Sequence, residues 1–150
     1  MDLLLWRHAD AADGEPDAAR PLTRRGESQA RAMAQWLKPR LPKDLRIVVS
    51  PARRAQQTAA ALTDDYETRD EIAVGADAAA VIRVAGWPDA DRPVLLVGHQ
   101  PTLGEVAAEL LTGRTAAWRI AKGAVWWIQS RRRGSRLEAI LKLAIEPESL

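Results

Sequence analysis

The chain has 150 residues, a length that suits one compact domain, and we expect residues 1–150 to form a single unit. It contains no cysteine, which excludes a disulfide framework, a thiolate nucleophile and a zinc–thiolate site. Its 22 basic and 20 acidic residues leave a net charge of only +2, and this near balance argues against nucleic acid as a partner.

The predicted elements alternate between strands and helices, as judged from apolar periodicity and turn residues. In chain order they are a strand over 3–6, a loop over 10–20, a helix over 23–38, a strand over 45–49, a helix that starts at 50, an edge strand over 66–69, a helix over 77–85, a strand over 94–97, a helix over 101–113, and a hairpin of strands over 124–128 and 137–143.

Residues with special backbone roles mark the ends of these elements. Thr23 is suited to cap the first helix, and Ser50 followed by Pro51 predicts a helix start with serine as the cap. Gly113 is expected to end the fourth helix, and Arg133-Gly134 to form the turn of the hairpin.

Alternating buried strands and helices imply an α/β fold, a mainly parallel sheet covered by helices on both faces. The terminal hairpin makes this sheet mixed, so we expect a three-layer α/β/α sandwich. Ligands of such folds bind beyond the carboxyl ends of the strands, near a switch in strand order. Candidate functional residues should therefore follow directly after buried strands.

The N-terminal segment gives no sign of export. A signal peptide begins with basic residues and continues with a longer apolar run than MDLLLWRHAD provides. No stretch of the sequence is long enough to span a bilayer. We therefore expect a cytoplasmic protein with no membrane partner.

The only two histidines both follow a predicted buried strand. His8 follows the strand over 3–6, and His99 follows the strand over 94–97. A lone histidine is more often structural, but two out of two at the ligand-binding edge favour a functional role. Gly98 before His99 allows a ligand to approach the backbone closely.

Arginines accompany these histidines. Arg7 precedes His8, and Arg54 lies in the first turn of the helix after the second strand, next to Arg53, which could take the same role. The guanidinium group is a rigid fork of donors suited to phosphate oxygens, and a helix N-terminus adds free N–H groups. These features predict an anion site.

A metal site is the alternative for two neighbouring histidines. Arginines and the positive end of a helix repel cations, and Asp10 alone does not complete a ligand set. We therefore expect neither a metal nor another cofactor.

Four segments in this order resemble the motifs of the histidine phosphatase superfamily, whose best-known branch is phosphoglycerate mutase. They are LWRHAD at 5–10, RPLTRRG at 20–26, SPARRAQQT at 50–58 and GHQP at 98–101. The short length and the last two motifs are most similar to the SixA-like phosphohistidine phosphatases. The resemblance covers most of the chain and implies a phosphoglycerate mutase-like fold.

The resemblance also implies roles for individual residues. His8 is expected to be the nucleophile that forms a phosphohistidine intermediate, and Arg7, Arg54 and His99 to hold the phosphoryl oxygens, with Gln100 as a further substrate-binding residue. In the family spacing the arginine falls on Arg54. The sequence departs from many relatives at Ala9, where a glycine is common, but the small size is kept.

The proton donor is a second departure. Many phosphatases of the family place a glutamate in the segment after the second helix, where this chain has Val74. Glu71, Asp77 and Asp10 are nearby carboxylates out of register, so the donor stays open between these three and none.

The leading hypothesis is a phosphatase that removes phosphate from phosphohistidine on a protein, for example a phosphotransfer domain. The alternatives are a phosphatase for a small phosphoester and a catalytically inactive phosphate-binding module. A mutase is disfavoured because the chain has little sequence left for a closed sugar-acid pocket. The basic run at 131–136 is interpreted as a solvated turn, with a contact for an acidic partner as the alternative.

Overall fold

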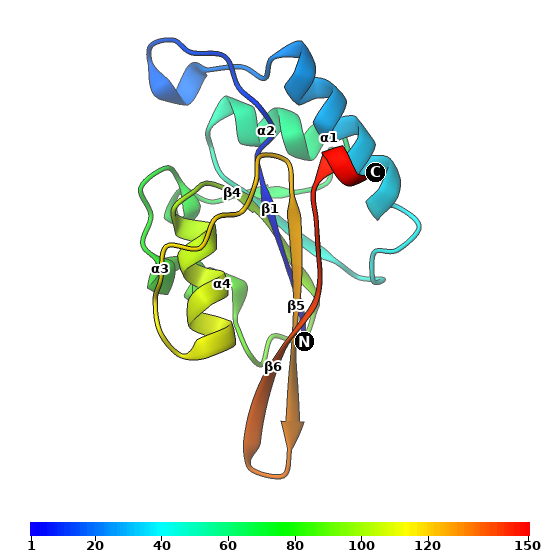
Figure 1. Ribbon diagram of the computed structural model, residues 1–150, viewed down its shortest axis with the longest axis vertical. Helices are drawn as coiled ribbons and strands as arrows, with labels where there is room; N and C mark the ends of the chain where they lie inside the picture. The colour runs from blue at the N-terminus through cyan, green and yellow to red at the C-terminus, as the bar shows by residue number, and fades with distance from the viewer.

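The computed structural model of the chain describes residues 1–150, and Figure 1 shows its elements. The strands are β1 (Asp2–Arg7), β2 (Arg46–Val49), β3 (Glu67–Thr68), β4 (Val94–Gly98), β5 (Val125–Arg133) and β6 (Arg136–Ile145). The α-helices are α1 (Arg24–Leu37), α2 (Arg53–Ala60), α3 (Ala78–Ala85) and α4 (Thr102–Thr112), and three short 3-10 helices are η1 (Asp17–Ala19), η2 (Asp70–Ile72) and η3 (Pro147–Ser149).

All six strands form one mixed sheet in the order β3-β2-β4-β1-β5-β6. β3, β2, β4 and β1 are parallel neighbours, whereas β5 runs antiparallel to β1 and to β6. In β1 the run Leu3–Trp6 is completely buried, because helices cover both sides of it. This explains why its sequence is continuously apolar rather than alternating.

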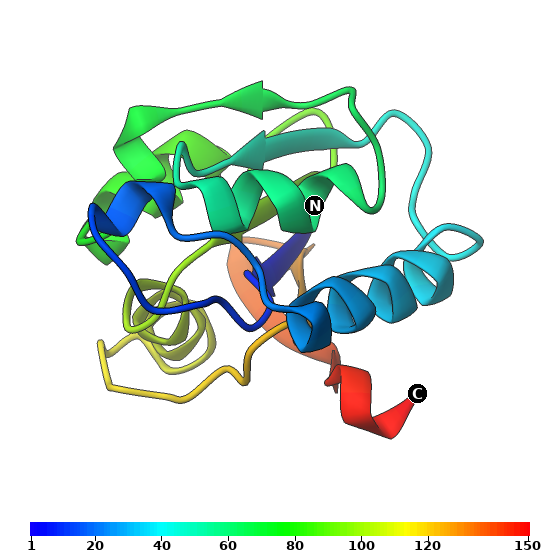
Figure 2. The ribbon, with the colours of Figure 1, turned by 90° about the horizontal axis from the view of Figure 1, so that it is seen from above.

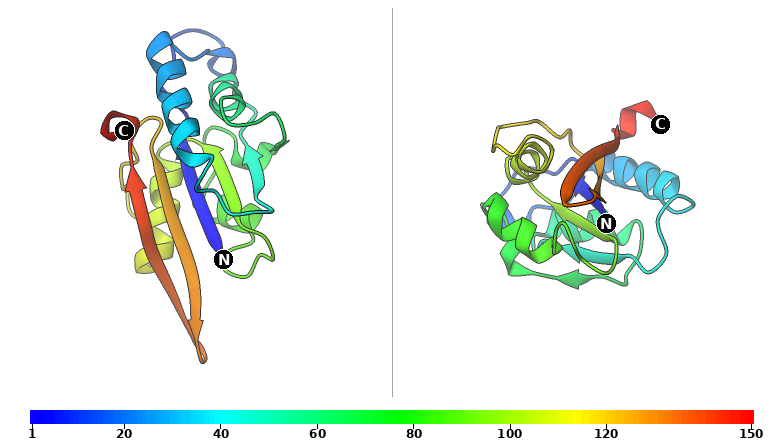
Figure 3. Two further views of the ribbon diagram at one scale, coloured as in Figure 1. Left: turned by 90° about the vertical axis from the view of Figure 1, so that its right-hand side faces the viewer. Right: turned by 90° about the horizontal axis from the view of Figure 1, so that it is seen from below.

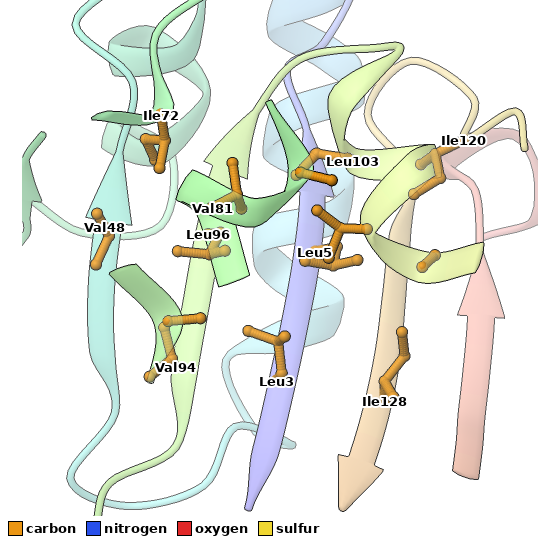
Figure 4. Close-up of a cluster of buried hydrophobic side chains, with 14 of the residues drawn as sticks. Leu3, Leu5, Val48, Ile72, Val81, Val94, Leu96, Leu103, Ile120 and Ile128 are labelled. Atoms are coloured by element: carbon orange, nitrogen blue, oxygen red, sulfur yellow. The ribbon is translucent and has the colours of Figure 1, made fainter. Parts of the chain in front are cut away.

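Helices cover the two faces of the sheet in pairs (Figure 2), which confirms the expected three-layer sandwich. One face packs side chains such as Leu5 and Leu96 against α3 and α4, through Val81 and Leu103 (Figure 4). The other face packs Trp6 and its neighbours against α1 and α2. No helix in the structure combines the length and the apolar character needed to cross a membrane.

The predicted serine cap of the second helix is wrong. α2 begins at Arg53, its N-cap is Ala52, and no side chain caps it. The hydroxyl of Ser50 accepts a hydrogen bond from the N–H of Ala52 at 3.2 Å, but it also lies 2.6 Å from a ring nitrogen of His99. The serine therefore stabilises the turn before the helix while facing the neighbouring strand end.

The terminal hairpin is longer than the sequence indicates. Its strands continue to Arg133 and restart at Arg136, and the hairpin projects beyond the other strands (Figure 3, left). Arg131 and Arg133 pair with Glu138, and Arg132 pairs with Asp89, all as exposed contacts. The basic run at 131–136 thus lies on a solvated surface, where three of its arginines have acidic partners. This agrees with its interpretation as a solvated turn.

Candidate active site

The carboxyl ends of three parallel strands meet at the centre of the sheet. The N–H of His8 donates to the carbonyl of Gly98 at 3.1 Å, and the N–H of Ser50 donates to the carbonyl of Val97 at 3.0 Å. The connection after β1 leads toward β2, and the connection after β4 leads to β5 on the opposite side. His8 and His99 therefore flank the switch in strand order, where ligands of α/β folds bind.

These strand ends form the floor of a pocket of about 300 Å³. All five residues predicted to react with or bind the substrate line this pocket, namely Arg7, His8, Arg54, His99 and Gln100. The other lining residues are Ala11, Asp17, Arg20, Val74 and Lys122. Arg53, the first residue of α2, is exposed and does not line the pocket. Of the two neighbouring arginines, only Arg54 is available to a ligand in this pocket.

His8 is a neutral ring whose Nε2 lone pair is directed at Arg54. Its Nδ1 lies 2.8 Å from the carbonyl oxygen of Ala9, an acceptor, so Nδ1 carries the proton. The opposite nitrogen, Nε2, accepts a hydrogen bond from Nε of Arg54 at 3.3 Å. Burial, opposed by the Ala9 contact and assisted by the charges of Arg54 and Arg7, lowers the pKa of His8 to about 4. The ring is therefore uncharged at neutral pH and carries a single proton, on Nδ1.

His99 lies beside His8, with 5.2 Å between the ring centroids. Its Nε2 is 2.6 Å from the hydroxyl of Ser50. Its other ring nitrogen, Nδ1, is buried and has no hydrogen-bond partner in the protein. Burial, followed by the charges of His8 and Arg54, lowers the pKa of His99 to about 3. In the tautomer in which the Ser50 hydroxyl donates to Nε2, the proton lies on Nδ1, which can then donate a hydrogen bond to an anion.

The two arginines are held by backbone carbonyls on opposite sides of the pocket. Arg54 is 3% exposed and donates to the carbonyl of Asp17 at 2.9 Å and to its carboxylate at 3.1 Å. Arg7 donates to the carbonyl of Ile120 at 2.9 Å. These contacts fix both guanidinium groups near His8.

Only two buried side-chain nitrogen or oxygen atoms in the chain lack a hydrogen-bond partner: Nε of Arg7 and Nδ1 of His99. Both belong to this pocket. Because buried polar groups are nearly always paired, two unpaired donors in one place indicate that a ligand with acceptor atoms completes the site. A phosphoryl group has such acceptors on three sides.

Gln100 lines the pocket, yet both ends of its amide already have partners. Its nitrogen donates to the carbonyl of Trp118 at 2.9 Å, and its oxygen accepts from the N–H of Gly104 at 2.8 Å. The side chain thus joins the start of α4 to the segment before β5. A direct contact between Gln100 and substrate stays a prediction.

The three alternative proton donors lie outside the pocket lining. Glu71 pairs with Arg69, and Asp77 caps α3 by accepting from the N–H of Ala80 at 2.8 Å. Asp10 pairs with Lys122 at 2.8 Å. Val74, at the position where relatives hold a glutamate, does line the pocket. None of the three candidates is placed to protonate a leaving group.

Sequence reasoning missed four residues at this site. Asp17 and Arg20 lie in the segment predicted as a plain loop and form an ion pair at 3.0 Å. Lys122 belongs to the turn before β5, and Ser50 was assigned to a helix cap. Asp17 reaches the pocket through a contact with Arg54, 37 residues further along the chain, and no local pattern signals it.

The buried neutral histidines make the stability of the protein depend on pH. Their folded pKa values of about 4 and about 3 lie below the ordinary 6.5, so the unfolded chain binds more protons between these values. The free energy of unfolding should therefore fall as the pH falls through 6.5, and the loss by pH 5 should be on the order of 2 kcal/mol for each histidine.

Urea unfolding at pH 7 and pH 5 measures this loss, because few carboxylates with ordinary pKa values titrate in that window. The His8→Asn/His99→Asn double variant is the control and should show little change. Equal stability of the native protein at both pH values would contradict the assignment of two buried neutral rings.

A neutral histidine with an unprotonated Nε2, two fixed guanidinium groups and a second imidazole define an enzyme of phosphoryl transfer that uses a histidine. No three His, Asp or Glu side chains gather to hold a metal ion. The comparison with protein families agrees: residues 3–77 match the histidine phosphatase superfamily (branch 1). The chain belongs to this superfamily and is a phosphatase.

Individual relatives are also similar. The phosphohistidine phosphatase SixA of Escherichia coli (strain K12) is 35% identical over 124 residues, 77% of each chain. The SixA homolog of Haemophilus influenzae is 33% identical over 130 residues, 73% of this chain and 77% of that protein. A solved structure of the protein histidine phosphatase SixA complexed with tungstate matches with a TM-score of 0.79 at 28% identity, over 99% of both chains. These matches confirm the predicted fold and the SixA-like resemblance.

Proposed function

We propose that this protein removes phosphate from phosphohistidine carried by another protein, and that His8 is the nucleophile. The observation that carries the proposal is the state of His8: its Nε2 lone pair faces a pocket of fixed cations, and its proton is held on Nδ1. A phosphorylated protein is also the kind of substrate named for the relatives that the chain resembles.

In the first step, Nε2 of His8 attacks phosphorus in line with the leaving group. Arg7, Arg54 and Nδ1 of His99 donate to the three equatorial oxygens, where charge accumulates in the transition state. Arg54 must exchange its hydrogen bond to His8 for one to phosphate, which frees the lone pair. The reaction then passes through a phosphohistidine on His8. This covalent intermediate replaces one difficult displacement by two easier ones.

In the second step, water attacks the phosphoryl group on His8, and the ring returns to its neutral state. The same three donors hold the phosphoryl oxygens, so no rearrangement of the pocket is needed between the steps. The proposal treats residues 1–150 as one catalytic domain, because the central sheet takes strands from both halves of the chain. It also places the protein in the cytoplasm, as the sequence leads us to expect.

The absence of an acid at Val74 favours phosphohistidine over alkyl phosphates. An alkoxide leaving group is strongly basic and needs a positioned proton donor, which typically contributes about two to four orders of magnitude. A phosphorylated imidazole can be protonated on its far nitrogen and then leaves as a neutral ring. The pocket offers no carboxyl group in the family position, so only good leaving groups should react quickly.

The test is a comparison of kcat/KM for a phosphohistidine protein, p-nitrophenyl phosphate and glycerol phosphate. We expect the first two to be cleaved and glycerol phosphate to be slower by about two to four orders of magnitude. The Asp10→Asn, Glu71→Gln and Asp77→Asn variants should keep the same ranking. Cleavage of glycerol phosphate at a rate equal to that of the phosphohistidine protein would refute the proposal in favour of a small-phosphoester phosphatase.

A further inference from the structure

Asp17 is the one carboxylate that lines the phosphate pocket. It belongs to η1, which lies beside the N-terminal end of α2 (Figure 2). Its carboxylate accepts from Arg54 at 3.1 Å and from Arg20 at 3.0 Å. A carboxylate repels phosphate. The roles given above to Arg7, Arg54 and His99 do not explain why an acidic side chain lines a pocket that binds an anion.

The exposed fractions of the side chains show which residues lie at the floor of the pocket and which lie at its mouth. His8, Arg54 and His99 are 7%, 3% and 4% exposed, whereas the side chain of Asp17 is 53% exposed. The nucleophile therefore attacks from the floor, and in-line displacement sends the leaving group toward the mouth. For a phosphoryl group attacked from this floor, Asp17 would lie on the side toward which the leaving group departs.

The carboxylate of Asp17 is ionised, and its side chain is half exposed. Its hydrogen bond from Arg54, followed by the charges of Arg54 and Arg20, holds the pKa of Asp17 below its ordinary value, so it cannot act as a proton donor at neutral pH. A phosphoryl group that binds Arg54 competes for the same guanidinium edge. Because the side chain is half exposed, it can turn from Arg54 toward the mouth when phosphate arrives.

The chemistry of phosphohistidine gives such a carboxylate a partner. In the reactive form the ring carries phosphorus on one nitrogen and a proton on the other, with a positive charge on the ring. A carboxylate that accepts this N–H stabilises the protonated ring and disfavours loss of the proton before reaction. Aryl and alkyl phosphates carry no N–H at this place and gain nothing from it.

We propose that Asp17 determines specificity by accepting a hydrogen bond from the far N–H of the phosphorylated imidazole, and so selects the protonated form of phosphohistidine. In the step, the bond from Nε2 of His8 to phosphorus forms and the bond from phosphorus to the substrate nitrogen breaks. The electron pair of the broken bond stays on the substrate ring, which leaves as neutral imidazole with its far proton in place. This inference rests on the function proposed above.

The charged and titratable groups around Asp17 come from several elements. Arg54 faces it from α2, Arg20 from its own segment, and Arg7, His99 and Lys122 from the other sides of the pocket. A purely structural role for Asp17, that of holding Arg54 in place, would affect every phosphate substrate equally. Substrate selectivity therefore separates the two roles, whereas the rate on one substrate does not.

The experiment compares phosphoimidazole with p-nitrophenyl phosphate, two small substrates without a protein surface, in the native protein and in Asp17→Asn. We expect kcat/KM for phosphoimidazole to fall by about tenfold to a hundredfold, the effect of one hydrogen bond to a charged group. The rate on p-nitrophenyl phosphate should fall by a smaller factor, because the backbone carbonyl of Asp17 still accepts from Arg54 when only the carboxylate contact is lost. Asp13→Asn removes the same charge from an exposed position in the same segment and should change neither rate.

The contrary outcomes are distinct. An equal fall on both substrates would show that Asp17 only positions Arg54, and no fall on either would show that it has no part in selection. Both results overturn the inference and leave the phosphohistidine function standing. If the native protein cleaves p-nitrophenyl phosphate but neither phosphoimidazole nor a phosphohistidine protein, the proposed function itself fails, and the role of Asp17 fails with it.

Discussion

Replacing His8 with alanine is expected to lower turnover by at least about a thousandfold on every phosphate substrate, because no other group in the pocket can take over as nucleophile. His99 is the only other imidazole, and its Nε2 is engaged with the hydroxyl of Ser50. Ser50 itself is buried and hydrogen-bonded in the same contact. The remaining pocket residues would still bind phosphate and position it, but with nothing to attack it.

The measurement is kcat on p-nitrophenyl phosphate for His8→Ala and His8→Asn, with unfolding curves to show that both variants are folded. His99→Ala provides the comparison: it should also be folded and slow, because it loses one of three donors to the phosphoryl group rather than the nucleophile. Turnover of both His8 variants within tenfold of the native rate would contradict the assignment of this residue.

Removing the guanidinium group of Arg54 is the change with the second largest expected effect. Arg54→Ala should lower kcat/KM by about a hundredfold to a thousandfold, the loss typical of one pre-organised donor to a developing charge. Arg54→Lys should recover little of this, because an ammonium group cannot reproduce the flat fork that spans two phosphoryl oxygens. The variant also leaves Asp17 with Arg20 as its only ion-pair partner, so that its charge repels phosphate more strongly.

The chain supplies a matched control in the preceding residue. Arg53 has the same side chain in the same helical turn, but it is exposed and does not line the pocket. Arg53→Ala should therefore keep nearly the native kcat/KM. If the two alanine variants lose activity equally, the effect comes from general charge rather than from a donor fixed at the phosphoryl group.

The central part of the site could be predicted because buried strands are easy to recognise. The apolar runs before His8 and His99 place both rings at the same edge of the sheet, and the parallel pairing of β1 with β4 brings them together. The position of Arg54 could be predicted in the same way, because it lies in the first turn of the helix that follows β2. Strand ends are local features, and the sheet then makes them neighbours.

The outer part of the site could not be predicted, because it depends on contacts that no periodicity encodes. Asp17 lies in a segment rich in small and polar residues, and only its distant contact with Arg54 gives it a place in the pocket. Ser50 was assigned to a helix cap because a serine before a proline has that role in many helices, yet its hydroxyl also reaches His99. The length of the hairpin was underestimated because its outer half pairs exposed arginines instead of apolar residues.

The most direct test of the central claim is to locate the phosphoryl group during turnover. The native protein would be mixed with a phosphorylated substrate, quenched in alkali within milliseconds to seconds, digested and examined by mass spectrometry. The account predicts an acid-labile, alkali-stable phosphoryl group on the peptide that contains His8. A phosphoryl group on His99 or Ser50 instead would contradict it, as would turnover with no covalent intermediate in a rapid-quench time course.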